Sequence, residues 1–473
     1  MSASLIRLAP VADELASRFR AAGHELYLVG GSVRDALLAR HSNDLDFTTD
    51  ARPEQILAVL TGWADAIWDT GIAFGTVGAR KGEQICEVTT FRADSYDRVS
   101  RNPQVTFGDS IEADLLRRDF TVNAMAVELV SGTFVDPYGG MTALHERSLD
   151  TPATPQESFA DDPLRMLRAA RFASQLGFQP APRVIAAMTD MAEQIERITK
   201  ERVQAELSKL ITGTYPRRGI ELLVDTGLAE RILPEVPAMR LEIDEHHQHK
   251  DVYQHSLVVL EQAIDLEQAE TPGKPDLVLR LAALLHDIGK PKTRRFEDGG
   301  GVSFHHHEVV GAKMVRKRMK ELRYAKDLTE DVATLVYLHL RFHGYGKGEW
   351  TDSAVRRYVT DAGPLLTRLH KLVRADCTTR NKRKAQQLRD TYTDLEQRIA
   401  LLAEQENLAK VRPDLDGNEI MRLLGLPPGP LVGKAWRYLK ELRLDRGPMD
   451  GDEAEAALFA WAKEQGITPP GQG

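Results

Sequence analysis

The fold is decided by Leu26-Tyr-Leu-Val-Gly-Gly-Ser-Val-Arg-Asp35 and by Asp44-Leu-Asp46-Phe47, which begins nine residues later. The apolar residues at the start predict a strand, the two glycines a tight turn, and residues 33–38 a short helix. Asp44 and Asp46 are two apart, so on a second strand both carboxylates point to one face. Glycines let a phosphate approach the backbone, and carboxylates are hard ligands for a divalent cation. The set predicts a site for a magnesium-bound nucleoside triphosphate.

This ordered set resembles the head of polymerase-β-like nucleotidyltransferases, specifically the class II branch that holds bacterial CCA-adding enzymes and poly(A) polymerases. Two longer motifs carry the same resemblance, Arg117-Arg-Asp-Phe-Thr-Val-Asn-Ala-Met-Ala126 and Asp161-Asp-Pro-Leu-Arg-Met-Leu-Arg-Ala-Ala-Arg-Phe172. The resemblance covers roughly residues 20–235. A second one, to HD domains, covers about 245–380.

The composition is that of a soluble, cytoplasmic protein. The chain has 473 residues, of which 42% are hydrophobic and two are cysteines, so we expect neither a disulfide framework nor a cysteine-rich zinc site. No signal peptide or run of membrane length is expected. The net charge of −8 argues against a nucleic-acid binder, yet the segments 311–326 and 374–390 are basic. Each is either a solvated helix face or part of an RNA-binding face.

We expect an α+β protein in which a polymerase-β-like nucleotidyltransferase head, a mixed sheet with helices, precedes an elongated all-α body containing an HD domain. The expected divisions are a head at 1–145, a helical neck for nucleobase recognition and RNA binding at 146–240, the HD domain at 241–385 and a helical tail at 386–473. Strands are predicted at 26–29, 44–48, 76–79, 85–90 and 124–130, and a long mobile loop at 93–116. Helices are predicted from Asp162-Pro163 to about Leu176 and over 200–211.

The resemblance implies a two-metal nucleotidyl-transfer site. In it Asp44 and Asp46 hold Mg²⁺ ions. Glu87 is either a third metal-binding carboxylate or a structural acid paired with an arginine. The triphosphate and sugar contacts implied by the family motifs fall on Gly31, Arg34, Arg118 and Asp119.

Asp162 and Arg165 are the implied readers of the nucleobase. A carboxylate accepts a hydrogen bond from the amino group of cytosine or adenine, and a guanidinium donates to the adjacent ring nitrogen. Guanine and uracil present a carbonyl oxygen instead, which leaves the carboxylate unpaired. Arg168 and Arg171, further along the same helix, are expected to bind the triphosphate. A purely structural interpretation, with Asp162 as the cap of a helix whose first residue is Pro163, remains open.

His255, His286, Asp287 and Asp376 follow the order of an HD-domain metal site, which suits a second divalent transition metal. His307 and His339 could complete a two-metal site, but His305, His306 and His343 are equally available in the sequence.

The sequence therefore predicts template-independent addition of CCA to the tRNA 3′ end from CTP and ATP, with no membrane and no obligate protein partner. One alternative is a poly(A) polymerase that adds AMP to RNA 3′ ends. Another is an HD-type metal-dependent phosphohydrolase or nucleotide sensor with a silent transferase head.

Overall fold

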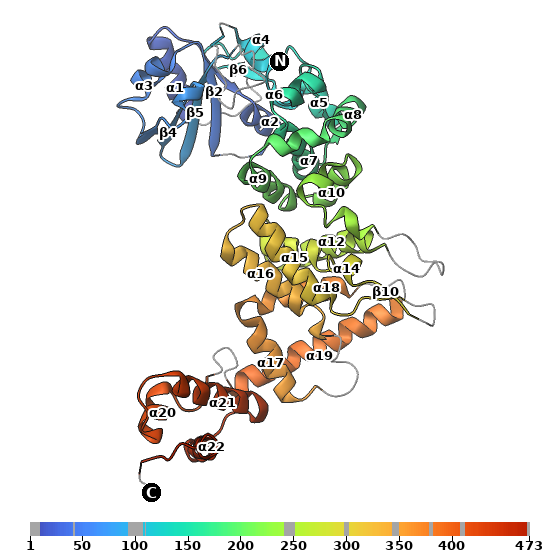
Figure 1. Cartoon of the computed structure of the whole chain (residues 1–473). Helices are drawn as coiled ribbons and strands as arrows, with labels where there is room; N and C mark the ends of the chain where they lie inside the picture. Colours follow the sequence, from blue (N-terminus) through green and yellow to red (C-terminus); the bar gives the residue numbers. More distant parts are fainter. Residues whose placement is uncertain are drawn as a thin grey trace. The chain divides into compact units, whose positions relative to one another are not determined.

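A computed structural model describes residues 10–40, 43–92, 107–108, 110–240, 251–297, 302–342, 350–377, 382–406 and 412–470 (Figure 1). The chain forms two compact units, residues 1–234 and 235–473. Each unit is described by itself. Among the described helices, none is both long and apolar enough to cross a membrane.

The first unit begins with a seven-stranded mixed sheet in the order β3-β4-β5-β2-β1-β6-β7. Strand β2 runs parallel to β5, and the other neighbours are antiparallel. The strands are β1 Leu26–Val29, β2 Asp44–Thr49, β3 Ala66–Trp68, β4 Thr76–Lys81, β5 Gln84–Thr90, β6 Ala126–Glu128 and β7 Phe134–Val135.

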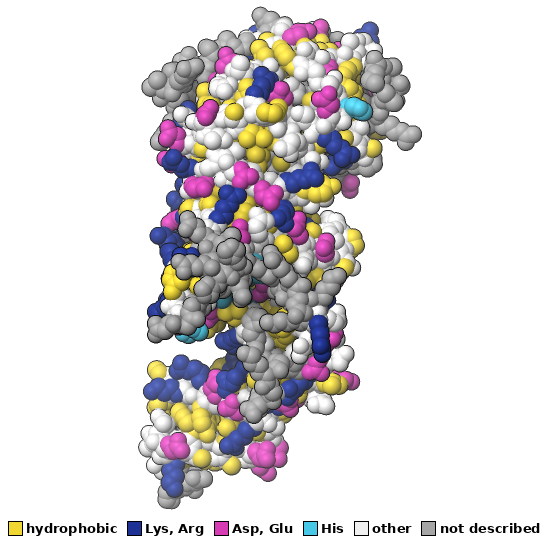
Figure 2. Space-filling view, turned by 90° about the vertical axis from the view of Figure 1, so that its right-hand side faces the viewer, with side chains coloured by type: hydrophobic (Ala, Val, Ile, Leu, Met, Phe, Trp, Pro, Cys, Tyr) yellow, Lys and Arg dark blue, Asp and Glu magenta, His cyan; other side chains and the backbone are white. Residues whose placement is uncertain are grey.

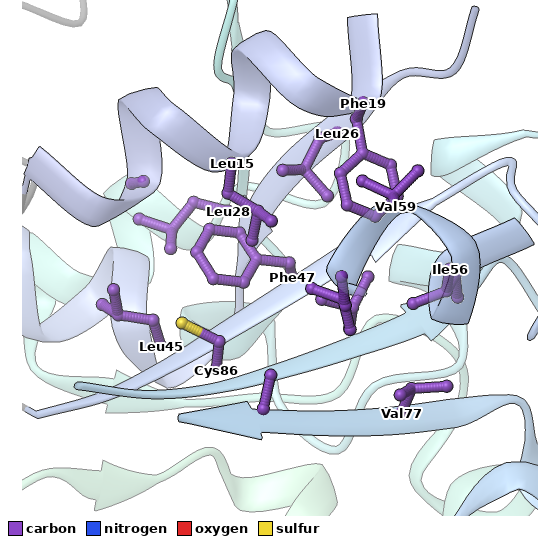
Figure 3. Packing of buried hydrophobic residues seen from close by; sticks show 14 of the residues in the cluster. Leu15, Phe19, Leu26, Leu28, Leu45, Phe47, Ile56, Val59, Val77 and Cys86 are labelled. Atoms are coloured by element: carbon purple, nitrogen blue, oxygen red, sulfur yellow. The ribbon is translucent and has the colours of Figure 1, made fainter. Parts of the chain in front are cut away.

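One face of this sheet is covered by α1 (Pro10–Ala21) and α3 (Pro53–Leu60). Alternate residues of the strands point into that core, where Phe47 lies among side chains of both helices (Figure 3). Because side chains alternate along a strand, Asp44 and Asp46 point to the opposite face. The apolar half of β2 thus fixes the orientation of its acidic half.

The predicted strands at 26–29, 44–48, 76–79 and 85–90 are confirmed within two residues at their ends. The strand predicted at 124–130 is shorter, because residues 121–123 form a 3-10 turn and only Ala126–Glu128 pair with β1. The loop predicted at 93–116 is wrong at its end. There α4 (Ile111–Leu116) forms, capped by the Ser110 hydroxyl and anchored by buried Ile111 and Leu115. Residues 93–106 and 109 lie outside the described part.

Helices complete the first unit. Helix α7 begins at Leu164, after Pro163, and ends at Gly177, whose φ of 72° suits glycine. The predicted helix at 200–211 is α9, with the same bounds. The helices are α2 Gly31–Leu37, α5 Gly140–Glu146, α6 Pro155–Asp161, α7 Leu164–Leu176, α8 Pro182–Asp190, α9 Lys200–Ile211, α10 Pro216–Asp225 and α11 Leu228–Ile232.

The second unit is almost entirely helical in its described part. A short hairpin of β10 (Arg295–Phe296) and β11 (Val302–Ser303) is its one described sheet. A separate hydrophobic cluster around Leu439 and Trp461 stabilises its last three helices. The helices are α12 Val252–Glu270, α13 Leu277–Leu285, α14 Lys290–Thr293, α15 His307–Glu321, α16 Lys326–Leu338, α17 Asp352–Ala362, α18 Leu366–Asp376, α19 Lys382–Glu406, α20 Gly417–Leu424, α21 Pro430–Arg446 and α22 Gly451–Glu464.

Surface charge follows the near-balance of the composition. On the face that Figure 2 presents, basic and acidic side chains are interspersed with hydrophobic ones. Function therefore has to be sought in local clusters of side chains rather than in net charge.

Candidate nucleotide site and candidate metal centre

Three carboxylates lie on the face of the head sheet opposite to α1 and α3. In the parallel pair of β2 and β5, Asp46 is in register with Glu87, and Asp44 is in register with Ile85. In-register residues of neighbouring strands project from the same face, so Glu87 joins Asp44 and Asp46 there. Asp44 and Glu87 are exposed and Asp46 is half-buried.

The charges of these three groups act on one another. Burial raises the pKa of Asp46, and the nearby Asp44 carboxylate raises it further, while Arg118, Arg168 and Arg34 oppose the change. Burial likewise raises the pKa of Glu87, followed by the charges of Asp46 and Asp44. Among the described residues, no arginine forms an ion pair with Glu87. The carboxylates repel one another, and a divalent cation would relieve that repulsion.

The paired glycines form the predicted turn. Gly30 has φ 66° and ψ −133°, and a Cβ atom there would lie 2.7 Å from Nη1 of Arg118. The positive φ therefore favours glycine at this position, and the missing Cβ also leaves room for the guanidinium of Arg118. The Ser32 hydroxyl in α2 accepts a hydrogen bond of 2.9 Å from the Asp46 backbone N–H, which ties the turn to the acidic strand.

Three guanidinium groups surround one aromatic ring. Arg34, Arg168 and Arg171 lie 5.1, 5.8 and 4.2 Å from the centre of the buried Phe172 ring. Arg34 also donates 2.7 Å to the side-chain oxygen of Asn123. Cation–π contacts hold these like charges side by side. Each guanidinium also has a carboxylate partner, which for Arg34 is Asp35 at 2.8 Å.

Asp119 is the buried counter-charge of this cluster. Its carboxylate accepts from Arg168 at 2.8 and 2.6 Å, from the Asn123 side chain at 3.0 Å and from the Phe120 N–H at 2.8 Å. Burial alone would raise the pKa of Asp119, but Arg168 and these hydrogen bonds lower it to about 2. A second buried acid, Glu206, lies 2.7 Å from Nε of Arg171. The resemblance gave Asp119 a sugar or hinge contact, and the structure shows a carboxylate that orients Arg168.

The two predicted base readers have separate partners in the structure. One oxygen of Asp162 accepts 3.1 Å from the Leu164 N–H, as a helix-capping carboxylate does, and the other lies 2.8 Å from Nη2 of Arg202. Arg165 instead donates to the Arg117 carbonyl at 2.7 Å and to the Ser158 hydroxyl at 2.9 Å. The capping interpretation of Asp162 is thus supported, although Pro163 precedes α7 rather than beginning it. Arg202 escaped sequence reasoning because nothing in Lys200-Glu-Arg202 distinguishes it from a surface charge.

In the second unit, six side chains converge from five segments. The Nε2 atom of His255 lies 2.9 Å from Asp376, and that of His286 lies 3.2 Å from Asp287 and 3.6 Å from Asp376. The other oxygen of Asp287 lies 3.1 Å from His307 and 3.8 Å from His339. The six side chains form two ligand groups, one of His255, His286 and Asp376, and one of Asp287, His307 and His339. Asp287 connects the groups, because its other oxygen lies close to His286 of the first group.

The second shell fixes which ring nitrogen faces the cluster. The Nδ1 atoms of His286, His307 and His339 donate to backbone carbonyls of Ala283, Phe304 and Val336 at 2.8, 2.8 and 2.6 Å. Each Nε2 is buried without a hydrogen-bond donor or acceptor partner. Rings oriented in this way direct Nε2 toward the carboxylates, an arrangement typical of metal ligands. His305 and His306 are exposed, and His343 lies outside the described residues.

Without a metal, this cluster has to hold a proton. Burial lowers the pKa of His286, but the carboxylates of Asp287 and Asp376 outweigh it and raise the value to about 10. Burial lowers the pKa of His339 to about 3, so that ring stays neutral. The donor set of imidazoles and carboxylates fits a divalent transition metal, whose binding would displace the proton.

Three family models match this chain. Residues 26–150 match the family described as Poly A polymerase head domain, residues 177–239 the probable RNA and SrmB-binding site of polymerase A, and residues 252–381 the HD domain. An A-adding tRNA nucleotidyltransferase of Deinococcus radiodurans is 34% identical over 446 residues, which cover 92% of this chain and 95% of that protein. The chain belongs to the family of tRNA nucleotidyltransferases and bacterial poly(A) polymerases, as the sequence motifs predicted.

Other relatives match mainly the first unit. The CCA-adding enzyme of Levilactobacillus brevis is 45% identical over 208 residues, and that of Anoxybacillus flavithermus is 40% identical over 222 residues. These cover 44% and 47% of this chain, which spans about half the length of the two enzymes, 51% and 54%. A crystal structure of the Bacillus stearothermophilus CCA-adding enzyme in complex with CTP is similar with a TM-score of 0.66 and 26% identity, covering 97% of this chain and 99% of that one. The predicted fold, an α+β head followed by a helical region with an HD domain, is confirmed.

Proposed function

We propose that this protein adds CCA to tRNA 3′ ends without a nucleic-acid template, using CTP and ATP. The observation that carries the proposal is the alignment of Asp44, Asp46 and Glu87 on one sheet face beside an arginine cluster. It is supported by the similarity to named CCA-adding enzymes.

The acidic face would hold Mg²⁺ through Asp44 and Asp46, with Glu87 as a third ligand. Bound magnesium lowers the pKa of an attacking ribose hydroxyl and neutralises charge on the leaving pyrophosphate. The chain itself supplies the shape of the site. The turn at Gly30 and Gly31 leaves room for phosphate oxygens next to the backbone, since neither residue has a side chain to exclude them.

The triphosphate would bind to the guanidinium groups around Phe172 and to Arg118. Arg34, Arg168 and Arg171 are already held in place by their own hydrogen bonds and by the ring, so little side-chain entropy is lost when an anion binds. Asp119 keeps Arg168 oriented. A preorganised cluster of this kind stabilises the charge that develops during phosphoryl transfer.

Base selection would depend on Asp162 and Arg165. Arg202 and the Leu164 N–H hold the Asp162 carboxylate in one orientation, from which it could accept the amino group of cytosine or adenine. Arg165 would have to leave the Arg117 carbonyl to donate to the base. That exchange offers a way to couple base binding to a movement of the segment that carries Arg117 and Arg118.

A second candidate function is addition of the terminal A alone. The relative that matches almost the whole chain is named an A-adding tRNA nucleotidyltransferase. The readers Asp162 and Arg165 serve adenine as well as cytosine, so the described geometry is compatible with both.

In the second unit we propose a pair of divalent metal ions held by His255, His286, Asp287 and Asp376 together with His307 and His339. Bound metals there would generate a hydroxide nucleophile for phosphate-ester hydrolysis. The HD activity is the alternative that remains if the head proves silent.

The test is extension of a tRNA that lacks its last three nucleotides, with CTP, ATP or both, sized at single-nucleotide resolution. Two additions with CTP and a third with ATP support CCA addition. Addition only to a tRNA already ending in CC supports the A-adding alternative, and a long ladder with ATP supports a poly(A) polymerase. The double variant Asp44→Ala/Asp46→Ala should abolish extension, while Asp65→Ala, at a loop of the same sheet, should not. Extension that survives the double change contradicts the site.

A further inference from the structure

A short hairpin extends from the metal cluster of the second unit. It leaves the cluster after Asp287 and returns at His307, and its strands are β10 and β11, paired with Arg295 opposite Ser303. Both of its connections are tied to the cluster. Lys290 lies 2.6 Å from Asp287, and the Phe304 carbonyl accepts from Nδ1 of His307 at 2.8 Å. Residues at the base of the hairpin therefore border the candidate metal site.

The surface of this hairpin combines an exposed aromatic ring with cations. Phe296 is 69% exposed, more than any other large hydrophobic residue in the described part of the chain. The guanidinium of Arg294 lies 5.0 Å from the centre of its ring. Arg295 and Lys292 are also exposed, as is Glu297, which follows Phe296 in sequence. Arg295 is the strand neighbour of Phe296, so its side chain projects from the opposite face of the hairpin. Within the described residues, these three cations have no carboxylate partner.

A second exposed aromatic–arginine pair in the same unit shows what is unusual here. Tyr337 is 40% exposed and lies 5.6 Å from the guanidinium of Arg341, but Arg341 forms an ion pair with Asp361. The charge of that pair is compensated within the protein. At the hairpin no carboxylate among the described residues pairs with Arg294, so its charge and the exposed ring are both accessible to a ligand.

We propose that the β10–β11 hairpin binds single-stranded nucleic acid, with one base stacked on Phe296 and adjacent phosphates paired with Arg294 and Lys292. A nucleobase is a flat π-system whose neighbouring phosphates are anions. It can stack on the Phe296 ring while the exposed cations pair with the phosphates. This surface lies outside the transferase head and outside residues 177–239, so it is a contact beyond the proposed function.

The test is photocrosslinking of the full-length protein with an eight-nucleotide RNA that carries 4-thiouridine, in the absence of nucleoside triphosphates. Crosslinked peptides are mapped by mass spectrometry. The peptide containing Phe296 should be labelled, and Phe296→Ala should reduce that labelling by about fivefold or more, the loss expected for one stacked base. Phe296→Trp should restore it, because tryptophan preserves the stacking surface.

Tyr337→Ala is the matched control and should leave labelling of the hairpin unchanged. The double change Arg294→Gln/Lys292→Gln should weaken the salt dependence of hairpin labelling by the amount that the loss of about one to two phosphate contacts produces. Crosslinks confined to the first unit overturn the proposal, as does hairpin labelling that Phe296→Ala leaves intact. So does labelling suppressed by an acidic peptide but not by unlabelled RNA, which would identify a protein-binding surface. None of these outcomes depends on whether the head adds CCA.

Discussion

Replacing Asp119 by asparagine tests the electrostatics of the arginine cluster. Asparagine keeps the size of the side chain and can still accept from the Phe120 N–H, but it loses the charge that faces Arg168. Folding lowers the pKa of Asp119 from its ordinary value of 3.8 to about 2. A difference of nearly two pKa units corresponds to about 2 kcal/mol of stability. We expect Asp119→Asn to destabilise the head by about that amount at pH 7.

The dependence on pH distinguishes this mechanism from simple loss of packing. Because the folded pKa is lowered, the stabilisation is fully present above the unfolded pKa of about 4 and is lost as the pH falls toward 2. The difference between wild type and Asp119→Asn should therefore be constant from pH 8 down to about pH 5 and should narrow below pH 4.

Hydrogen exchange followed by mass spectrometry is the appropriate assay, since a chain with two units need not unfold in one step. In Asp119→Asn, the amides of α7 peptides should exchange about thirtyfold faster, which is the factor that corresponds to 2 kcal/mol. Asp150→Asn is the matched control. Its partner Arg183 is half-exposed, so a change under 1 kcal/mol is expected. A difference that titrates near neutral pH, or equal effects of the two variants, would refute the reasoning.

Three further predictions concern the Asp162–Arg202 pair, the metal cluster and the Glu267–Arg280 pair. Arg202→Ala should cost under 1 kcal/mol of stability, because the pair is solvent-exposed, yet should reduce discrimination against UTP and GTP in single-nucleotide addition; unchanged selectivity contradicts a role in base reading. A divalent transition metal at one hundred times its dissociation constant should stabilise the second unit by about 2.7 kcal/mol, an effect that His286→Ala removes and the exposed control His305→Ala retains in thermal unfolding. Glu267→Ala should destabilise the second unit by about 3–5 kcal/mol in denaturant unfolding, because it leaves the buried guanidinium of Arg280 without its carboxylate partner. A loss of stability below about 1 kcal/mol would argue against a stabilising role of this ion pair.

Local pattern was enough for the parts of this protein that depend on neighbours in sequence. The alternation of Leu45 and Phe47 with Asp44 and Asp46 specifies which face of the strand is acidic, because the period of a strand is two. The end of the helix at Gly177 and the ends of four of the five predicted strands could be predicted equally well. His286 and Asp287 could be predicted as candidate metal ligands, because the motif that indicates them lies within a few residues.

Contacts between distant segments could not be obtained in this way. The pairing of Asp46 with Glu87 depends on strand register, and the choice of His307 and His339 over their neighbours depends on which rings are buried and directed by a backbone carbonyl. Helix α4 was missed because it has only six residues, and its stability comes from burying Ile111 and Leu115 against the sheet.

The most informative difference concerns Asp162. The sequence by itself determined that a carboxylate precedes Pro163 at the start of α7, and that arginines follow at every third position. Only the tertiary structure decided that its partner is Arg202, 40 residues away, and that Arg165 binds the Arg117 carbonyl. The physical reason is that ion pairs form between charges that packing brings within reach. Spacing along one helix indicates which charges are available, and the packing of α9 against α7 selects among them.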